Sequence, residues 1–142
     1  MKRVLILCTG NSARSQMAEG LWRELGRGEW EAFSAGTAPA GAVHPLAIQV
    51  LAELGIDISR QETKHVGSLA GRRFDLAITV CSGAAEACPR PPGAARTLQW
   101  PLPDPAAAGG SEKERRAVFR AVRDELRARI EAFLAEGPAA TA

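Results

Sequence analysis

The segment from Cys8 to Ser15 constrains this chain more than any other. It reads Cys-Thr-Gly-Asn-Ser-Ala-Arg-Ser, follows the hydrophobic run Arg3–Leu7 and precedes a helical pattern. A strand, a tight polar loop and a helix start direct backbone N–H groups and the positive end of a helix dipole toward one point. Such a point binds a tetrahedral oxyanion such as phosphate, sulfate or arsenate.

The residue types in this loop indicate a reactive thiol beside the anion. Donors that hold an oxyanion also stabilise a thiolate, which is the nucleophilic form of Cys8. Arg14 adds a planar fork of N–H donors that fits an oxyanion. The alternative is a buried structural cysteine followed by an arginine on a solvated helix start. The predicted oxyanion-binding residues are Thr9, Gly10, Asn11, Ser12, Ala13, Arg14 and Ser15.

Hydrophobic periodicity predicts strands that alternate with helices. The expected strands are Arg3–Leu7, Trp30–Ser34, Asp75–Val80 and Thr97–Trp100. The expected helices are Ser15–Leu25, Pro45–Leu54, a short helix that starts at Ser59, where Ser59 and Glu62 have capping-box spacing, and a long helix that begins at Ser111 and stops at Gly137-Pro138. This order predicts a three-layer α/β/α fold around a four-stranded parallel sheet. We expect one catalytic domain over residues 1–137 and a flexible tail over residues 138–142.

Reactive residue types follow three of the predicted strands. Cys8, Cys81 and Asp104 each come after a strand, and ligands of parallel α/β sheets bind beyond the carboxyl ends of the strands. We therefore expect the three residues to lie at one edge of the sheet. The alternative is that their common location is accidental, because every strand is followed by a loop.

Cys81 and Cys88 form a second informative pair. Residues seven positions apart on a helix lie about 10 Å apart along its axis, whereas a disulfide needs Cα atoms within roughly 7 Å. We therefore predict that residues 82–87 are helical when the thiols are reduced and looped when they are oxidised. The alternatives are two independent core cysteines or a zinc site with His44 or His65. Zinc cysteines are usually two to four residues apart, so no metal site is predicted.

The number of thiols separates two reactions. Phosphoryl transfer needs Cys8 as nucleophile, Arg14 to stabilise charge and Asp104 to protonate the leaving oxygen. Reduction by two electrons needs a second thiol, because it converts two thiols into a disulfide. In the predicted relay Cys81 attacks Cys8, then Cys88 attacks Cys81, and an external dithiol reduces the final Cys81–Cys88 bond.

Composition excludes several other classes. The formal net charge is +2, and no basic run is interleaved with aromatic residues, so no nucleic-acid partner is expected. No apolar stretch reaches membrane-spanning length and no signal peptide is evident, so we expect a cytoplasmic protein without a membrane partner. Cysteines in that compartment are usually catalytic, redox-active or metal-binding.

Several motifs together resemble the thioredoxin-coupled arsenate reductases, which share the low-molecular-weight protein tyrosine phosphatase fold. The motifs are the loop with its extension Gln16-Met17-Ala18-Glu19-Gly20, then Ser34-Ala35-Gly36, the pair Cys81 and Cys88-Pro89, and Asp104-Pro105. The resemblance implies that Cys8 attacks arsenate and that Arg14 binds the oxyanion and the transition state. It also implies that Ser15 and Asn11 hold the thiolate and the loop.

The same resemblance implies the rest of the cycle. Asp104 is the general acid, Cys81 and Cys88 form the relay, thioredoxin restores the thiols, and arsenite is the product. Phosphate and sulfate would compete with arsenate for the loop. No bound cofactor is implied, and we expect a monomer.

The chain departs from the family pattern at two positions. Some members carry a further cysteine in the loop where this chain has Ala13. Some members bind potassium through groups that match Asn11, Glu19 and Ser34 and through a carboxylate near position 64, where this chain has Lys64. The Lys64 ammonium could pair with Glu19 and replace the cation, so we predict no potassium requirement; the alternative is a solvated surface lysine.

Two other functions fit parts of the pattern. A low-molecular-weight phosphatase would use Cys8, Arg14 and Asp104 alone. Phosphatases of this group often carry tyrosines after the Asp-Pro, and this chain has no tyrosine, which argues against phosphotyrosine as substrate. A non-catalytic thiol redox sensor would keep Cys81 and Cys88 without needing Asp104.

Overall fold

The computed structural model describes residues 1–81 and 93–136. Cys88, the predicted change of shape in residues 82–87 and the predicted tail after residue 137 lie outside these ranges.

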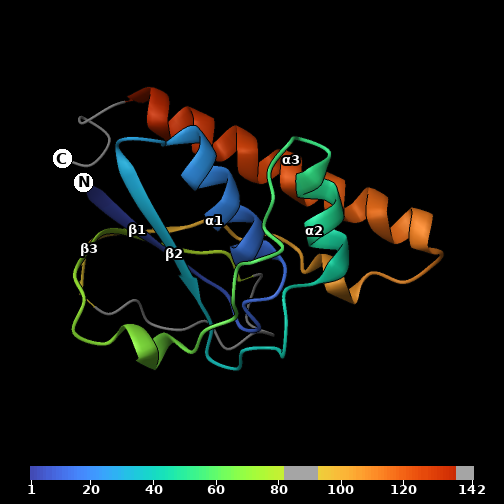
Figure 1. Ribbon diagram of the computed structural model, residues 1–142, viewed down its shortest axis with the longest axis horizontal. Helices are drawn as coiled ribbons and strands as arrows, with labels where there is room; N and C mark the ends of the chain where they lie inside the picture. Colours follow the sequence, from blue (N-terminus) through green and yellow to red (C-terminus); the bar gives the residue numbers. More distant parts are fainter. Residues whose placement is uncertain (82–92, 137–142) are drawn as a thin grey trace.

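Four strands form one parallel sheet in the order β2-β1-β3-β4 (Figure 1). Their bounds are β1 (Lys2–Leu7), β2 (Trp30–Ala35), β3 (Phe74–Thr79) and β4 (Ala94–Gln99). Leu7, at the carboxyl end of β1, pairs with Ala35 on β2 and with Thr79 on β3. The carboxyl ends of these strands therefore meet at one edge, as predicted.

Three helices cover one face of the sheet (Figure 1). They are α1 (Arg14–Leu25), α2 (Pro45–Ala52) and α3 (Glu112–Glu136). Alternate strand residues such as Ile6 and Ile78 point into this layer, because successive side chains of a strand face opposite sides of the sheet. They pack against Trp22, Phe119 and other apolar side chains of the helices in the main core.

The second face of the sheet has a thinner cover. Leu5, Leu7 and Ala77 pack there against Leu69 of the short 3₁₀ helix η1 (Val66–Leu69). Among the described residues this 3₁₀ helix and its flanking segments form the third layer. The α/β class and the four-stranded parallel sheet predicted from the sequence are confirmed.

The prediction of a helix that starts at Ser59 is wrong. Residues 59–60 form a turn and residues 61–64 have no regular secondary structure. The Asp57 carboxylate accepts the Ser59 N–H at 2.8 Å, so the local hydrogen bond closes an Asx turn instead of capping a helix. The following residues bond to the loop after β1, as described below.

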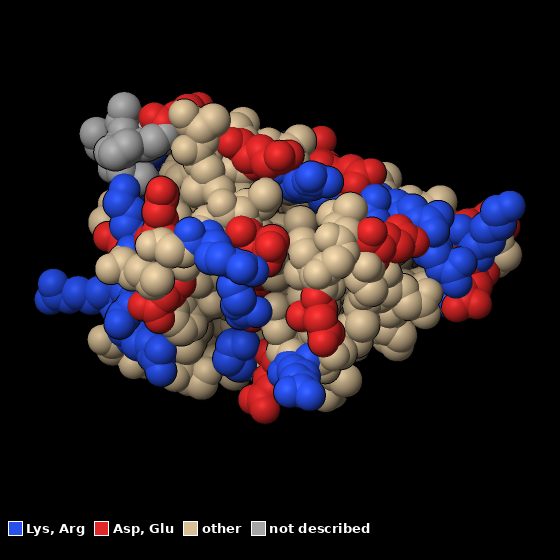
Figure 2. Space-filling model, turned by 45° about the horizontal axis from the view of Figure 1, so that its top comes forward, with Lys and Arg blue, Asp and Glu red and all other residues tan. Residues whose placement is uncertain are grey.

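Charged side chains fasten α2 to α3. Arg120 donates to both oxygens of Glu53, and Arg123 donates to Glu53 Oε1 at 2.8 Å and to the Val50 carbonyl. The hydrogen bonds from Arg120 in particular lower the pKa of Glu53 to about 2. Figure 2 shows basic and acidic side chains interspersed over this face. No helix in residues 1–81 and 93–136 combines the length and hydropathy needed to span a bilayer.

Candidate active site

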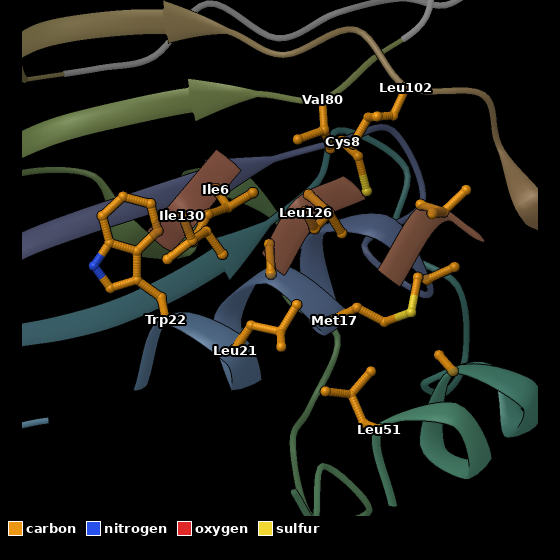
Figure 3. Packing of buried hydrophobic residues seen from close by; sticks show 14 of the residues in the cluster. Ile6, Cys8, Met17, Leu21, Trp22, Leu51, Val80, Leu102, Leu126 and Ile130 are labelled. Atoms are coloured by element: carbon orange, nitrogen blue, oxygen red, sulfur yellow. The ribbon is translucent and has the colours of Figure 1, made fainter. Parts of the chain in front are cut away.

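Cys8 stands where β1 ends and the loop toward α1 begins. Its side chain is buried, with 2% of the residue exposed, at the end of the main core beside Val80 and Leu102 (Figure 3). The cysteine therefore presents one sulfur atom at the floor of the loop rather than on the surface.

The carbonyl groups of the loop are held on its outer side by the segment that follows β2. The hydrogen bonds run from Ala38 N to Thr9 O (3.0 Å), from Ala40 N to Gly10 O (2.9 Å) and from His44 N to Ser12 O (2.8 Å). In a planar trans peptide the N–H points opposite to the C=O. The N–H groups of these peptide units therefore face the inside of the loop.

Asn11 and Ser15 surround the sulfur with donors. The Asn11 N–H, which belongs to the peptide unit of the Gly10 carbonyl, donates to Cys8 Sγ at 3.2 Å. Asn11 Oδ1 accepts from the Lys64 N–H at 2.8 Å, and this contact orients the amide so that Nδ2 donates to Ser15 Oγ, also at 2.8 Å. Since Ser15 Oγ is already an acceptor there, its own proton is available to Cys8 Sγ, 2.9 Å away. Two donors therefore point at the one sulfur atom.

Arg14 is buried at the start of α1 and braces the far side of the loop. Its Nη1 donates to the carbonyls of Val80 (3.2 Å) and Leu102 (3.0 Å), which follow β3 and β4. Its Nη2 lies 3.9 Å from Asp104 Oδ2. The guanidinium thus links three segments at the carboxyl edge of the sheet.

Asp104 caps the short 3₁₀ helix η2 (Pro105–Ala107). Its Oδ1 accepts from the Ala106 N–H at 3.0 Å, which leaves Oδ2 turned toward Arg14. The side chain is 40% exposed, so the carboxylate can exchange a proton with solvent. This geometry suits a group that gives a proton to an atom leaving the anion site.

Cys81 follows the strand β3, which lies beside β1 in the sheet. Leu7 and Thr79 are Cα partners, and the Val80 N–H donates to the Leu7 carbonyl at 3.0 Å, so pairing continues to the residue before Cys81. Cys81 is buried at 7% exposure. The structure therefore brings Cys8, Arg14, Ser15, Cys81 and Asp104 to one edge of the sheet, while Cys88 lies outside the described residues.

Glu19 is the buried carboxylate behind the loop. Its Oε1 accepts from Ser34 Oγ at 2.7 Å and lies 3.7 Å from Lys64 Nζ, and its Oε2 accepts from Arg23 at 2.7 Å. The ion pair between Lys64 and Glu19 expected from the sequence is present, so Lys64 is not merely a solvated surface residue.

The two histidines considered as zinc ligands have structural contacts. His44 Nδ1 accepts the Leu46 N–H at the start of α2, and His65 Nδ1 accepts the Gly67 N–H at the start of η1. Burial, and then the Arg115 charge, lower the pKa of His44 against the opposing effect of Asp104. Within the described ranges no three His, Cys, Asp or Glu side chains are grouped as metal ligands.

Known proteins are similar to this chain in sequence and fold. The sequence matches the family described as low molecular weight phosphotyrosine protein phosphatase over residues 3–138. The chain belongs to this family. An arsenate reductase of Halalkalibacterium halodurans is 43% identical over 136 residues, which cover 96% of this chain and 97% of that protein.

Solved structures with this family's fold are also similar. An arsenate reductase in the phosphate-binding state superposes with a TM-score of 0.79 at 35% identity, covering 96% of this chain and 98% of the other. A thioredoxin-dependent arsenate reductase from Corynebacterium glutamicum superposes with a TM-score of 0.64 at 30% identity, covering 93% of this chain and 63% of the other.

Apart from Lys64, sequence reasoning missed the segment after Asp57 that holds the loop of this family member from behind. Gln61 and Glu62 bond to Gln16 at the start of α1, and the Lys64 N–H bonds to Asn11 in the loop. Contacts between segments that are far apart in the sequence leave no local periodicity. The only sequence signal for these contacts was the run of polar residues after Asp57.

Proposed function

We propose that this protein reduces arsenate to arsenite through Cys8, Cys81 and Cys88, with thioredoxin as the source of electrons. The observation that carries the proposal is the position of Cys8 and Cys81 at the ends of hydrogen-bonded neighbouring strands. A phosphatase reaction needs only the first of these thiols, whereas a reduction needs a second thiol within reach of the first.

In the first step the Cys8 thiolate attacks arsenic. A sulfur–arsenic bond forms and the bond from arsenic to a hydroxyl group breaks, and Asp104 gives its proton to the departing hydroxyl, which leaves as water. The inward N–H groups of the loop and the Arg14 guanidinium stabilise the charge on the remaining oxygens. Arsenic is still pentavalent in this adduct.

In the second step Cys81 attacks the Cys8 sulfur. The sulfur–sulfur bond forms, the sulfur–arsenic bond breaks, and its electron pair stays on arsenic, which leaves as trivalent arsenite. Cys88 then attacks Cys81 and releases the Cys8 thiolate. A thioredoxin dithiol reduces the Cys81–Cys88 disulfide, so each arsenate consumes two thiols and the cycle returns to three.

The names of the relatives support this assignment. The relative from Halalkalibacterium halodurans and the two solved structures described above are arsenate reductases, and one of those two structures is described as thioredoxin-dependent. The family description itself supports a second candidate, a phosphatase that uses Cys8, Arg14 and Asp104. We propose this as at most a weak side activity on phosphate esters.

A thiol count in a single turnover tests the proposal. The reduced protein, which has three cysteines, is mixed with excess arsenate in the absence of any external reductant. We expect thiols to fall from three to one per chain as one arsenite forms. A protein that keeps all three thiols while it hydrolyses a phosphate ester would be a phosphatase instead.

A further inference from the structure

In the segment from Cys8 to Ser15, called the anion loop below, one carbonyl accepts a hydrogen bond from a side chain instead of a backbone group. The carbonyls of Thr9, Gly10 and Ser12 accept from backbone N–H groups of the segment after β2, whereas the Asn11 carbonyl accepts from Gln16 Nε2 at 2.9 Å. Asn11 has a φ of 48°, in the left-handed region. A reversal of backbone direction at this residue turns its carbonyl away from the donors that serve its neighbours.

The Gln16 amide is fully buried and its described contacts fix its orientation. Nε2 also donates to the Glu62 carbonyl at 2.9 Å, and Oε1 accepts from Gln61 Nε2 at 2.8 Å. Gln61 is itself held, since its Oε1 accepts from Arg23 at 2.9 Å. Both amide protons and the amide oxygen of Gln16 are thus engaged, and a rotated amide would place its oxygen against two carbonyl oxygens.

The Asn11 carbonyl controls a group that faces the anion. Its peptide unit carries the Ser12 N–H, which points opposite to the carbonyl. If the carbonyl turned inward, an oxygen lone pair would replace an N–H donor where the oxyanion binds. A hydrogen bond on the outer side therefore keeps the loop in its anion-binding form.

We propose that Gln16 is a positioning residue for oxyanion binding at Cys8, acting through Asn11 and oriented by Gln61. It does not touch the anion or the sulfur. The inference rests on the proposed oxyanion-binding role of the loop, and it adds a residue to which the resemblance gives no task.

The test uses three substitutions and a matched control. Gln16→Glu is isosteric, but its carboxylate cannot donate to the two carbonyls, and Gln16→Leu removes the amide. Gln61→Leu keeps the Gln16 amide and removes the group that orients it, together with the Gln61 bonds to the Gln16 carbonyl and to Arg23. Gln49→Leu is the control, because Gln49 is exposed on α2 and accepts from Arg116 on α3. Inorganic phosphate binding is measured by calorimetry, and Cys8 alkylation by iodoacetamide is measured against pH in a background where Cys81 and Cys88 are Ser.

We expect Gln16→Glu and Gln16→Leu to raise the phosphate Kd at least tenfold and to move the alkylation midpoint to higher pH. Gln61→Leu should shift both in the same direction by a smaller factor, and Gln49→Leu should shift neither. Folded Gln16 variants with a Kd within twofold of wild type and an unmoved midpoint would overturn the proposal. If the Gln16 variants do not fold, an unchanged Gln61→Leu protein overturns it.

The same experiment separates this inference from the proposed reaction. Wild-type protein that binds phosphate and shows the expected Gln16 dependence, yet does not reduce arsenate, leaves the positioning role intact and removes the reductase assignment. Wild-type protein that binds neither phosphate nor arsenate at the loop contradicts both.

Discussion

Arg14 and Asp104 meet at the carboxyl edge of the sheet, with Arg14 Nη2 3.9 Å from Asp104 Oδ2. The arginine opens α1, and the aspartate follows β4, the last strand of the sheet in sequence order. Each is fixed by main-chain groups, Arg14 by the Leu102 carbonyl and Asp104 by the Ala106 N–H. The proposed anion ligand and the proposed proton donor are therefore held side by side before any anion binds.

Replacing Asp104 tests the proton donor. We expect Asp104→Asn to lower arsenate turnover by roughly a hundredfold or more, because general acid catalysis contributes about 10²–10⁴ to a rate. Phosphate binding should stay within a few fold of wild type, since Arg14 and the loop remain. Calorimetric binding and steady-state turnover on the same preparations check this. Unchanged turnover would remove Asp104 from the chemistry.

Replacing Gly36 tests how closely the backbone after β2 packs against the outer side of the loop. A Cβ on Gly36 would overlap the Thr9 carbonyl oxygen and lie 2.7 Å from the Cys8 carbonyl oxygen, both of them backbone atoms. We expect Gly36→Ala to lower the free energy of unfolding by about 1–3 kcal/mol and to weaken phosphate binding.

Chemical denaturation and calorimetry measure both effects. Gly109→Ala is the matched control, because a Cβ there meets nothing within 4 Å. It should change the stability by no more than about 0.5 kcal/mol. Equal behaviour of the two alanine variants would show that the contact between Gly36 and the loop carbonyls carries no constraint.

Replacing Lys64 tests whether its ammonium group takes the place of a potassium ion beside Glu19. The Lys64 ammonium lies 3.7 Å from Glu19 Oε1, and Glu19 is buried. We expect the Tm of the wild-type protein to be the same in potassium chloride and in sodium chloride. Lys64→Met should lower the Tm and make it rise with potassium, because Glu19 Oε1 then loses the ammonium group while the ion pair of Glu19 Oε2 with Arg23 remains.

The comparison needs a variant that changes charge elsewhere. Lys113→Met on α3 alters the net charge equally and should show no dependence on potassium. A potassium-dependent Tm in the wild-type protein would contradict the replacement.

The parts of the fold that local pattern determines were predictable. The strand β1, the helix α1 and the loop between them follow from one hydrophobic run, one polar turn and one helical period, and they appear within one residue of the predicted bounds. The strand β4 was predicted from Thr97 but begins at Ala94, because small residues carry little hydrophobic signal. Its start is set by pairing with Phe74, which is a tertiary contact.

The long-range contacts of the site were not predictable in detail. Sequence reasoning placed Cys8, Cys81 and Asp104 at one edge because parallel strands end together. It could not place Gln16 or Gln61, since their hydrogen bonds join residues that are far apart in the sequence. The failed helix at Ser59 has the same origin, because the backbone groups of Glu62 and Lys64 bond to Gln16 and Asn11, which are far away in the sequence.

His44 gives a pH dependence with a definite sign. Burial, and then Arg115, lower the pKa of His44 below 6.5 in the folded protein. The unfolded chain therefore takes up a proton at a higher pH than the folded protein does, and stability is lost as pH falls below about 6.5. His44→Asn keeps a side chain that can cap α2 but does not titrate. Its stability should fall less steeply than that of wild type between pH 7 and pH 5.5.

Urea denaturation at several pH values measures this difference. His65→Asn is the control, because His65 caps η1 in the same way and lies outside the His44 surroundings. Parallel pH profiles of wild type and His44→Asn would mean that His44 titrates alike in the folded and unfolded states.

The most direct test of the central claim is arsenate-dependent consumption of NADPH in the presence of thioredoxin and thioredoxin reductase. Wild type is compared with Cys8→Ser, Cys81→Ser and Cys88→Ser. The three-thiol relay predicts turnover in wild type and its loss in each single variant. No arsenate turnover in wild type, together with phosphate-ester hydrolysis that needs Cys8 but neither Cys81 nor Cys88, would contradict it and identify a phosphatase.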